Sequence, residues 1–393
     1  MKIGFWNPQR VLRFLFIVFF ILLFSHVSLF AQQIKIGIYY KYNVFSAAVA
    51  VNEGNYILYA PDSVIKLDTS GNIKISLVNN QIRVQQGSEL IGSYNKISLS
   101  GKDFYNSLKI KILNPSLPGR IYDDNIHVVI RNNKLQFINE VDMDRYVAGV
   151  VEAESGRKAQ IEYYKTQAVI CRTYALEKFY RHYDEGFNLC DDVHCQVFKG
   201  HGYQHPEIIE ATLLTSGLII IDTNMNLITA NFHSSCGGQT ADVKNVWQKP
   251  MLHLKSVSDT FCIREESVFW EKQIAKNAWI QYLKRYGFRN ASADVDLTYL
   301  QPYRKAYYIL GDDSIILTKI RTDWNLRSTF FSIYPDGEYI IMKGRGYGHG
   351  VGLCQIGAMK MAEEGYKFSE IIQHYYQNTY IVPLKAWQFF KEY

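Results

Sequence analysis

The stretch Asp142-Met-Asp-Arg-Tyr-Val-Ala-Gly-Val-Val-Glu-Ala-Glu154 marks the point where the chain changes from a β-type to a helical pattern. Before it, from residue 34 to about residue 137, short apolar runs alternate with turn signals, which is typical of strands. After it, apolar residues recur every three or four positions, which predicts a helix to about residue 154 and a longer one over residues 158–181. The sequence therefore predicts an α+β fold with a β-rich N-terminal region followed by a mixed α+β domain.

Further along the chain the pattern is mixed. We expect strands and loops after Gly200, a helix over about residues 271–286, and a strand-rich return over residues 315–342. Two closing helices, separated near Gly365, complete the chain.

One face of the first predicted helix carries three valines and a glutamate at spacings of three, four and seven: Val147, Val150, Val151 and Glu154. A carboxylic acid among apolar side chains resists ionisation, so the pKa of Glu154 is expected to be raised. A carboxyl group that stays protonated near neutral pH can serve as a general acid. The next helix presents Arg172 as the only charge on a largely apolar face. Arg172 either forms a buried ion pair with Glu154 or faces a substrate.

A second informative stretch is Gly344-Arg-Gly-Tyr-Gly-His-Gly-Val-Gly-Leu-Cys-Gln-Ile-Gly357, in which glycine occupies every second position up to Gly352. If this segment is extended, the glycines leave one side bare, and the side chains that project together are Arg345, Tyr347, His349 and Val351. A bare side lets a ligand or another backbone approach closely, at an entropic cost. The alternative is a tight turn that packs a strand on a helix. The spacing fits no phosphate-binding motif, so no nucleotide cofactor is expected.

The N-terminal segment predicts export. Residues 1–31 contain three basic residues, no acidic residue and a long apolar run, and Ala31 precedes a polar pair, as in a secretory signal; an uncleaved anchor helix is the alternative. We therefore expect the protein in the periplasm or cell envelope. The remaining chain has 40 Lys and Arg against 37 Asp and Glu. This near-neutral balance, without a basic run, argues against a nucleic-acid partner.

Two cysteines and two histidines lie within a short span and can form a tetrahedral zinc site: His182, Cys190, His194 and Cys195. Six cysteines in an exported chain also favour disulfides, so Cys190 and Cys195 could pair with each other or with other cysteines. Four protein ligands would make the zinc structural. A third alternative is a thiol nucleophile, either Cys236 with His233 or His349 as its base, or Cys354 at the start of a helix.

Six blocks in one order resemble the SpoIID family, the stage II sporulation protein D group that includes LytB-type amidase enhancers: Ile138–Glu154, Lys165–Leu176, His194–Gly200, Phe232–Thr240, Leu254–Val257, and the glycine stretch continued to Ala358. They cover roughly residues 120–380. The resemblance divides the chain into a signal peptide (1–31), a β-rich region (32–120) and a SpoIID-type domain (121–393). The chain departs from the family pattern at residues 155–158, after the glutamate, and at residues 251–254.

Family members with lytic activity cleave peptidoglycan glycan strands between N-acetylmuramic acid and N-acetylglucosamine, and leave an anhydro sugar end. The resemblance implies that Glu154 is the catalytic acid and that Arg172 contacts the substrate. It places further glycan contacts at Lys255, Arg345 and Tyr347, and implies either glycan contact or support for the catalytic helix at His349 and Gln355. It also raises the expectation of zinc on the histidine and cysteine set. The implied partner is an N-acetylmuramoyl-L-alanine amidase that removes the stem peptides. The alternative is a non-catalytic peptidoglycan-binding activator of such an amidase.

Overall fold

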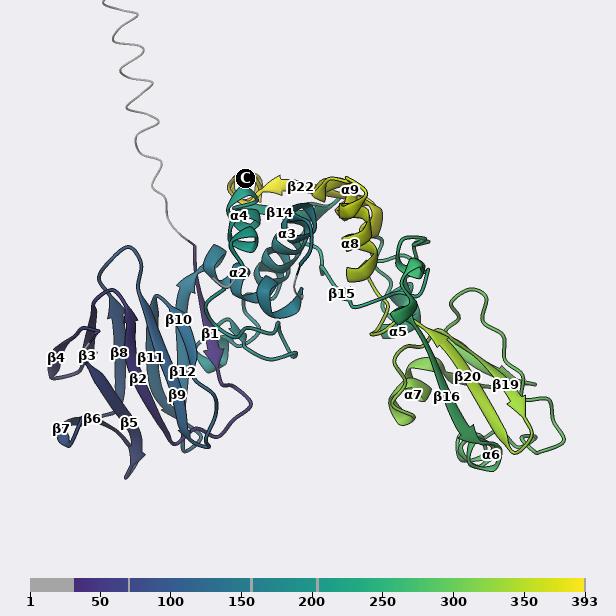
Figure 1. The fold of residues 1–393 in the computed structure, drawn as a ribbon, viewed down its shortest axis with the longest axis horizontal. Helices are drawn as coiled ribbons and strands as arrows, with labels where there is room; N and C mark the ends of the chain where they lie inside the picture. The colour runs from purple at the N-terminus through teal and green to yellow at the C-terminus, as the bar shows by residue number, and fades with distance from the viewer. Residues whose placement is uncertain (1–31, 70, 156–157, 203–204, 392–393) are drawn as a thin grey trace, which may run out of the picture. The chain divides into compact units, whose positions relative to one another are not determined.

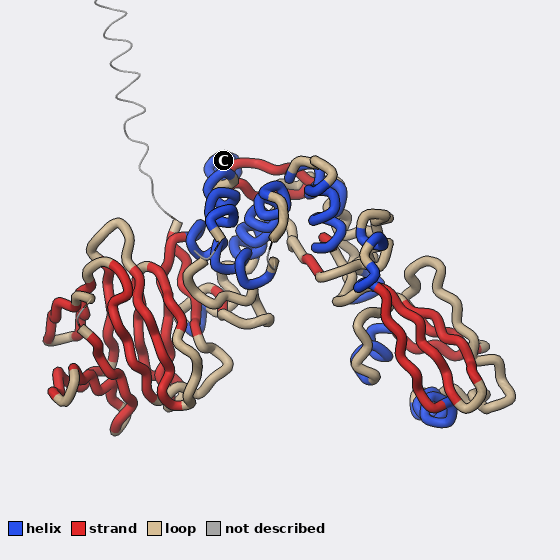
Figure 2. The backbone as a smooth tube through the Cα atoms, viewed as in Figure 1, coloured by secondary structure: helices blue, strands red, loops and turns tan. Residues whose placement is uncertain are grey.

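The computed structural model describes residues 32–69, 71–155, 158–202 and 205–391. The predicted signal peptide, residues 1–31, and the central pair of the departure at residues 155–158 lie outside the described residues. Figure 1 labels the elements and Figure 2 distinguishes helices from strands. The predicted α+β fold class is confirmed, because strands dominate up to residue 142 and helices follow directly.

Two sheets form the N-terminal region. One has the strand order β13-β1-β12-β11-β8-β3-β4 and the other the order β10-β9-β2-β5-β6-β7. They meet where β12 packs on β5 and β11 on β6. The strand bounds are β1 (Gln33–Ile38), β2 (Ser46–Glu53), β3 (Tyr56–Ala60), β4 (Ser63–Leu67), β5 (Asn72–Val78), β6 (Gln81–Gln86), β7 (Glu89–Tyr94), β8 (Lys96–Gly101), β9 (Ser107–Asn114), β10 (Arg120–Asp123), β11 (Asn125–Arg131) and β12 (Lys134–Asp142).

Alternation along the strands explains this packing. In β9, Leu108 and Ile110 are fully buried while Lys109 and Lys111 are exposed, so one face of the strand enters the core. The predicted boundary at residue 120 falls inside these sheets, since β10 pairs with β9 and β11 pairs with β8.

The helical part begins without a loop. Asp142 is the last residue of β12, and its carboxylate caps α2 by accepting hydrogen bonds from the backbone amides of Asp144 and Arg145. The antiparallel pairing of β14 with β22 joins the end of the chain to this part. The elements are α2 (Met143–Glu154), α3 (Ile161–Glu177), β13 (Leu189–Cys190), α4 (Pro206–Leu214), β14 (Leu218–Asp222), β15 (Phe232–His233), α5 (Lys244–Trp247), β21 (Leu353–Cys354), α8 (Gln355–Glu363), α9 (Phe368–Tyr375), β22 (Thr379–Pro383) and α10 (Leu384–Lys391).

Between α5 and β21 the chain builds a second hydrophobic core around Trp279. It consists of β16 (Phe269–Ala275), α6 (Lys276–Arg285), β17 (Tyr307–Leu310), β18 (Asp313–Ile316), α7 (Leu317–Asp323), β19 (Phe331–Asp336) and β20 (Tyr339–Arg345), with a sheet in the order β16-β20-β19. The prediction of one helix over residues 271–286 is wrong in its first part, because residues 269–275 pair with β20 and the helix begins at Lys276.

Of the helices in the described ranges, none is long and apolar enough to cross a membrane.

Candidate active site and metal clusters

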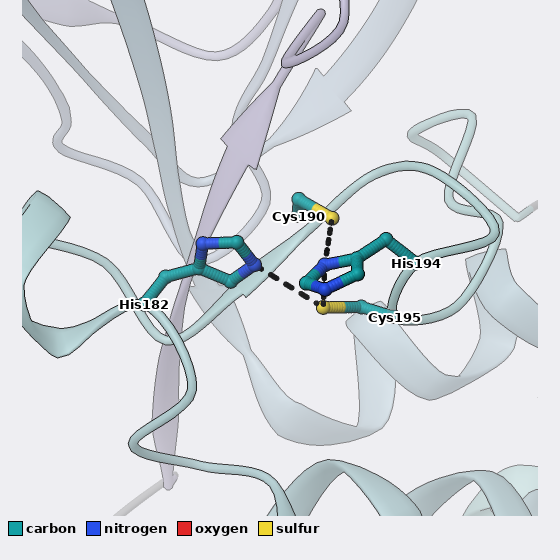
Figure 3. Close-up of side chains that lie close together, drawn as sticks. All are labelled: His182, Cys190, His194 and Cys195. Carbon is teal, nitrogen blue, oxygen red and sulfur yellow. Dashed lines mark hydrogen bonds between the residues drawn. The ribbon is translucent and has the colours of Figure 1, made fainter.

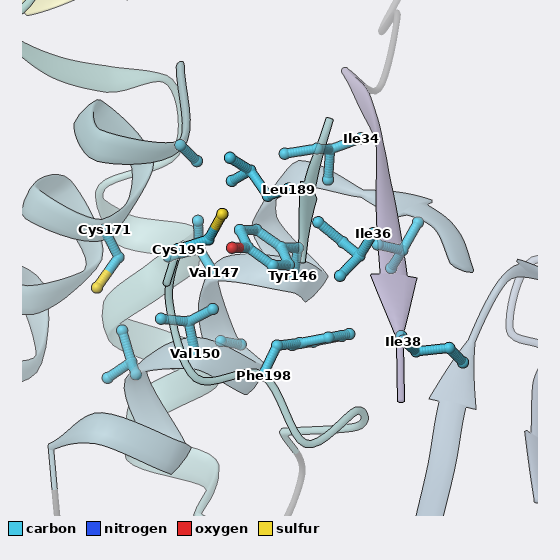
Figure 4. Packing of buried hydrophobic residues seen from close by; sticks show 14 of the residues in the cluster. Ile34, Ile36, Ile38, Tyr146, Val147, Val150, Cys171, Leu189, Cys195 and Phe198 are labelled. Atoms are coloured by element: carbon cyan, nitrogen blue, oxygen red, sulfur yellow. The ribbon is translucent and has the colours of Figure 1, made fainter. Parts of the chain in front are cut away.

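Glu154 ends α2 on the face that the valines bury. Val147, Val150 and Val151 are fully buried, and Figure 4 shows Val147 and Val150 in a cluster with Tyr146, Phe198 and β1 isoleucines. The rings of Tyr146 and Phe198 lie 5.1 Å apart. The helical spacing thus carries the last residue of the helix to the edge of an apolar core, where Glu154 is half-buried.

Two hydrogen bonds from two separate later segments of the chain hold Glu154. The backbone amide of Val197 donates to Oε1 of the carboxyl group at 2.8 Å. The side-chain amide of Gln355 donates to the backbone carbonyl of Glu154 at 3.0 Å. Burial raises the pKa of Glu154, while the Val197 amide and the charge of Lys199 oppose that rise. The predicted direction of the shift is confirmed.

The segment that carries Val197 packs closely on α2. The hydroxyl of Tyr146 donates to Oε1 of the buried Gln196 at 3.2 Å. A Cβ atom on Gly149 would lie 2.3 Å from the carbonyl oxygen of Gly200, so only glycine allows this approach. The position of Val197 relative to Glu154 is therefore fixed by packing on both sides of it.

Arg172 does not face a substrate. Its side chain is 1% exposed and donates from Nη2 and Nε to Oδ1 of Asp144, at 2.7 and 3.1 Å. Its remaining donors reach the carbonyl oxygens of Thr212, Thr215 and Leu218. Asp144 lies ten residues before Glu154, which is about 15 Å along a helix axis. The expectation of a substrate contact is therefore wrong in this structure, and so is the alternative of a Glu154 ion pair. Arg172 joins α3 to α2 and to the segment after α4.

The four predicted zinc ligands converge (Figure 3). Their nearest ligand atoms all lie within 4.8 Å of one another. The sulfur of Cys195 is 3.5 Å from Nε2 of His182 and 3.8 Å from Nδ1 of His194, which is also 3.8 Å from the sulfur of Cys190. A tetrahedral ion with Zn–S of about 2.3 Å and Zn–N of about 2.0 Å separates sulfur from nitrogen by roughly 3.5 Å. The residues therefore fit a zinc ion. We call this set the first cluster.

Residues around the first cluster orient its ligands. Nδ1 of His182 lies 2.6 Å from Oε1 of Glu185, the arrangement in which a carboxylate fixes the tautomer of a ligating histidine. The ring of Phe187 stacks on His182 at 4.9 Å. Cys190 belongs to β13, which pairs in parallel with β1, Gly37 lying opposite Cys190. The N-terminal sheet therefore forms one wall of the cluster.

The glycine stretch is not extended. Beyond Arg345, where β20 ends, glycines 346, 348, 350 and 352 all have positive φ, between 71° and 110°. A Cβ atom on Gly352 would lie 2.0 Å from the carbonyl oxygen of Asn231, and one on Gly346 would lie 2.8 Å from that of Ser235. The prediction of a close approach is right, and the backbone that approaches the glycines is the segment of residues 231–236. The prediction that Arg345, Tyr347, His349 and Val351 project to one side is wrong.

The five predicted glycan contacts have different environments. Lys255 and Tyr347 are exposed, Tyr347 by 56%. The Arg345 guanidinium lies 4.0 Å from the centre of the Phe330 ring and donates to the Pro302 carbonyl. Arg345 also lines a cavity of about 420 Å³ beside aromatic residues: Phe269, Phe330, Phe331 and Tyr334. The substrate roles of these residues stay predictions.

Two of the predicted residues, His349 and Gln355, are half-buried. The ring of His349 lies 5.5 Å from that of His233 and 5.2 Å from that of Trp247. Burial lowers the pKa of His349 to about 4, so its ring is neutral at neutral pH. Gln355 is engaged with the carbonyl of Glu154, which makes it a support for the end of α2.

The thiol candidates form a second cluster that the sequence did not predict. The atoms of Cys236, Asp259, Cys262 and Cys354 that could hold a metal lie within 4.8 Å of one another, and all four residues are fully buried. The thiol of Cys236 donates to Oδ2 of Asp259 at 3.1 Å. A buried thiol paired with a carboxylate cannot meet a substrate, so the nucleophile alternative is not supported for Cys236.

The family model described as stage II sporulation protein, SpoIID, matches residues 131–221. Over these residues the chain is similar to the SpoIID family. The matched segment contains α2, α3 and the whole first cluster. The resemblance seen in the sequence is thereby confirmed, although the match covers less of the chain than the six blocks.

Relatives of the SpoIID domain extend the similarity. The chain is 26% identical over 315 residues to an uncharacterized protein of Brachyspira hyodysenteriae, covering 79% of this chain and 80% of that one. It is 27% identical over 275 residues to stage II sporulation protein D of Bacillus subtilis, covering 64% and 77%. It is 25% identical over 360 residues to the amidase enhancer of Bacillus subtilis, covering 73% of this chain and 50% of the enhancer. These similarities indicate a role related to the cell wall.

Proposed function

We propose that the protein is an exported lytic transglycosylase that cleaves peptidoglycan glycan strands stripped of their stem peptides. The observation that carries the proposal is the placement of Glu154 at the end of α2, half-buried beside valines, with a raised pKa and one oxygen held by the Val197 amide. Burial is the largest cause of the raised pKa, and the Val197 amide and the charge of Lys199 oppose it.

A single carboxyl group suits this reaction. Ordinary glycosidases flank the bond with two carboxylates. In the proposed reaction Glu154 protonates the glycosidic oxygen, and the bond from that oxygen to the anomeric carbon of N-acetylmuramic acid breaks. The 6-hydroxyl of the same sugar attacks the anomeric carbon and returns its proton to Glu154. The product is a 1,6-anhydro sugar, and no water is consumed.

The first cluster supports this arrangement as a structural zinc site. Its four ligands leave no open position for a substrate or water. Zinc there would hold Cys195, and Val197, which binds the Glu154 carboxyl group, lies two residues further along. The proposed role of the metal is therefore to position the loop that contacts the acid.

The test compares three proteins on amidase-treated peptidoglycan, with mass spectrometry of the released sugars. The wild type should release anhydromuramic ends and Glu154→Gln should release none. Glu152→Gln is the matched control, because it removes a neighbouring carboxylate on the same helix and should keep the activity. Sugar release by Glu154→Gln at the wild-type rate would refute the assignment of the acid.

A second candidate is a non-catalytic activator of a cell-wall amidase, favoured by the similarity to the amidase enhancer of Bacillus subtilis. In that case no variant and no wild type releases sugars, whereas both the wild type and Glu154→Gln bind the glycan and stimulate an N-acetylmuramoyl-L-alanine amidase. Measuring amidase rates beside sugar release separates the two functions.

A further inference from the structure

The second cluster combines three sulfur atoms and one carboxylate from three distant segments. Cys236 and Cys354 are 118 residues apart in the sequence, and the backbone amide of Cys236 donates to the sulfur of Cys354 at 3.2 Å. Asp259 and Cys262 come from the segment before the second hydrophobic core. The ligand atoms of all four residues lie within 4.8 Å of one another.

Asp259 is a buried carboxylate whose hydrogen-bond donors in the described residues are all uncharged groups. It is fully buried, and its Oδ1 accepts from the backbone amides of Phe261 and Cys262 while its Oδ2 accepts from the Tyr375 hydroxyl at 2.9 Å and the Cys236 thiol. Within the described ranges, none of its hydrogen-bond partners carries a positive charge. A buried charge is normally paired with an opposite charge or coordinates a metal.

A disulfide does not explain the cluster. Joining any two of the cysteines would leave the third thiol and the carboxylate buried beside the bond. A divalent cation would instead engage all four groups and balance the charge of Asp259 and the thiolates. Cysteine sulfur and aspartate oxygen are both zinc ligands, and four of them make a closed structural site.

The surroundings match those of ligating residues. The carboxylate of Asp259 is oriented by two amides and a hydroxyl, as ligating carboxylates are. The sulfur of Cys354 accepts hydrogen bonds from the amides of Cys236 and Gly357, the second at 3.4 Å. The three sulfur atoms therefore lie close to one another and to the Asp259 carboxylate.

We propose that Cys236, Asp259, Cys262 and Cys354 bind a second structural zinc ion. It would tie the segment of residues 231–240 and the segment of residues 259–262 to Cys354, which lies in the glycine stretch directly before α8. Gln355 follows Cys354 directly and donates to the Glu154 carbonyl, so this ion would also support the end of α2.

Metal analysis of the purified protein, prepared without reductant or chelator, tests the proposal. The wild type should contain two equivalents of zinc, one for each cluster, and expose six free thiols after denaturation with chelator. Cys190→Ser/Cys195→Ser should keep only the equivalent of zinc at the second cluster. Asp259→Asn/Cys262→Ser should lose that equivalent. Cys171→Ala is the control, because Cys171 is buried outside both clusters and its removal should keep both equivalents.

The proposal can still be tested if the variant of the second cluster fails to fold. The Cys190→Ser/Cys195→Ser protein can be reconstituted with Co²⁺, and sulfur-to-cobalt charge-transfer absorption should then report the second cluster alone. The proposal is overturned if this folded protein binds neither zinc nor cobalt, or if peptide mapping finds a disulfide among Cys236, Cys262 and Cys354.

Discussion

The backbone amide of Val197 donates a hydrogen bond to Oε1 of Glu154 at 2.8 Å, and this contact joins the first cluster to the carboxyl group. Cys195 lies two residues before Val197, and the buried Gln196 between them is held by the Tyr146 hydroxyl. A backbone donor is insensitive to side-chain replacement, so its position depends on the residues that fix the loop. The chemistry proposed for Glu154 would thereby depend on residues that do not touch it.

Replacing Lys199 should change the pH dependence of sugar release. The positive charge of Lys199 lowers the pKa of Glu154, so Lys199→Gln should raise it. The acid must be protonated to act, and the rate falls as the pH rises through its pKa. The alkaline limb of the pH–rate profile should therefore move to higher pH, less so at high salt, because Lys199 is exposed. Lys284→Gln on α6 should leave the limb in place.

Replacing Arg172 should reduce the free energy of unfolding, which the loss of a substrate contact alone would not do. Arg172→Met removes the partner of Asp144 and three carbonyl contacts, and breaking a buried pair costs about 3–5 kcal/mol. Urea denaturation should show this loss in the free energy of unfolding. Arg172→Lys should recover only part of it, because lysine lacks the fork of donors. Unchanged stability with a raised KM would instead support the original expectation of a substrate contact.

Glu185→Gln should weaken zinc binding at the first cluster. The carboxylate orients His182 through Nδ1, and loss of such a partner typically lowers metal affinity about 10–100-fold. Competition with a chromophoric chelator measures the change. Asp184→Asn is the matched control, since Asp184 is exposed and its carboxylate does not contact His182. Equal zinc affinity in the two variants would contradict the proposed role.

Gln355→Ala should loosen the end of α2. It removes the donor to the Glu154 carbonyl, and a hydrogen bond of this kind contributes about 1 kcal/mol. We expect a small loss of stability in thermal denaturation and a lower kcat, because the carboxyl group is less well placed. If Gln355 acted only by binding the glycan, Gln355→Ala would raise KM and leave both the stability and kcat unchanged.

Features of the fold and the site could be predicted from the sequence where a single residue pattern or a single short span of the chain produces them. The spacing of the valines in α2 was enough to predict the burial of Glu154 and the direction of its pKa shift. The first cluster could be predicted because His182 to Cys195 lie close together in the chain. The fold class followed from the change of pattern at Asp142.

Features made by distant segments could not be predicted in this way. Asp144, the partner of Arg172, lies 28 residues away on another helix. Neither sequence segment has a pattern that predicts this pair. The second cluster draws on three segments, so its cysteines looked like separate nucleophile candidates. In β16 two apolar residues, Phe269 and Trp270, are followed by three polar ones, so residues 269–275 lack the alternation of a strand, and only pairing with β20 makes them one.

The parallel pairing of β1 with β13 also sets an order of assembly. Lys35 and Asn188, which are hydrogen-bonded at this junction, are separated by 153 residues. The edge of β1 that pairs with β13 therefore stays unpaired until the residues near Cys190 have been synthesised and have reached it. Contacts between such distant positions form slowly. We therefore expect the loop that reaches Glu154 to take shape only after this long-range pairing, and a chain arrested before that step to have an incomplete site.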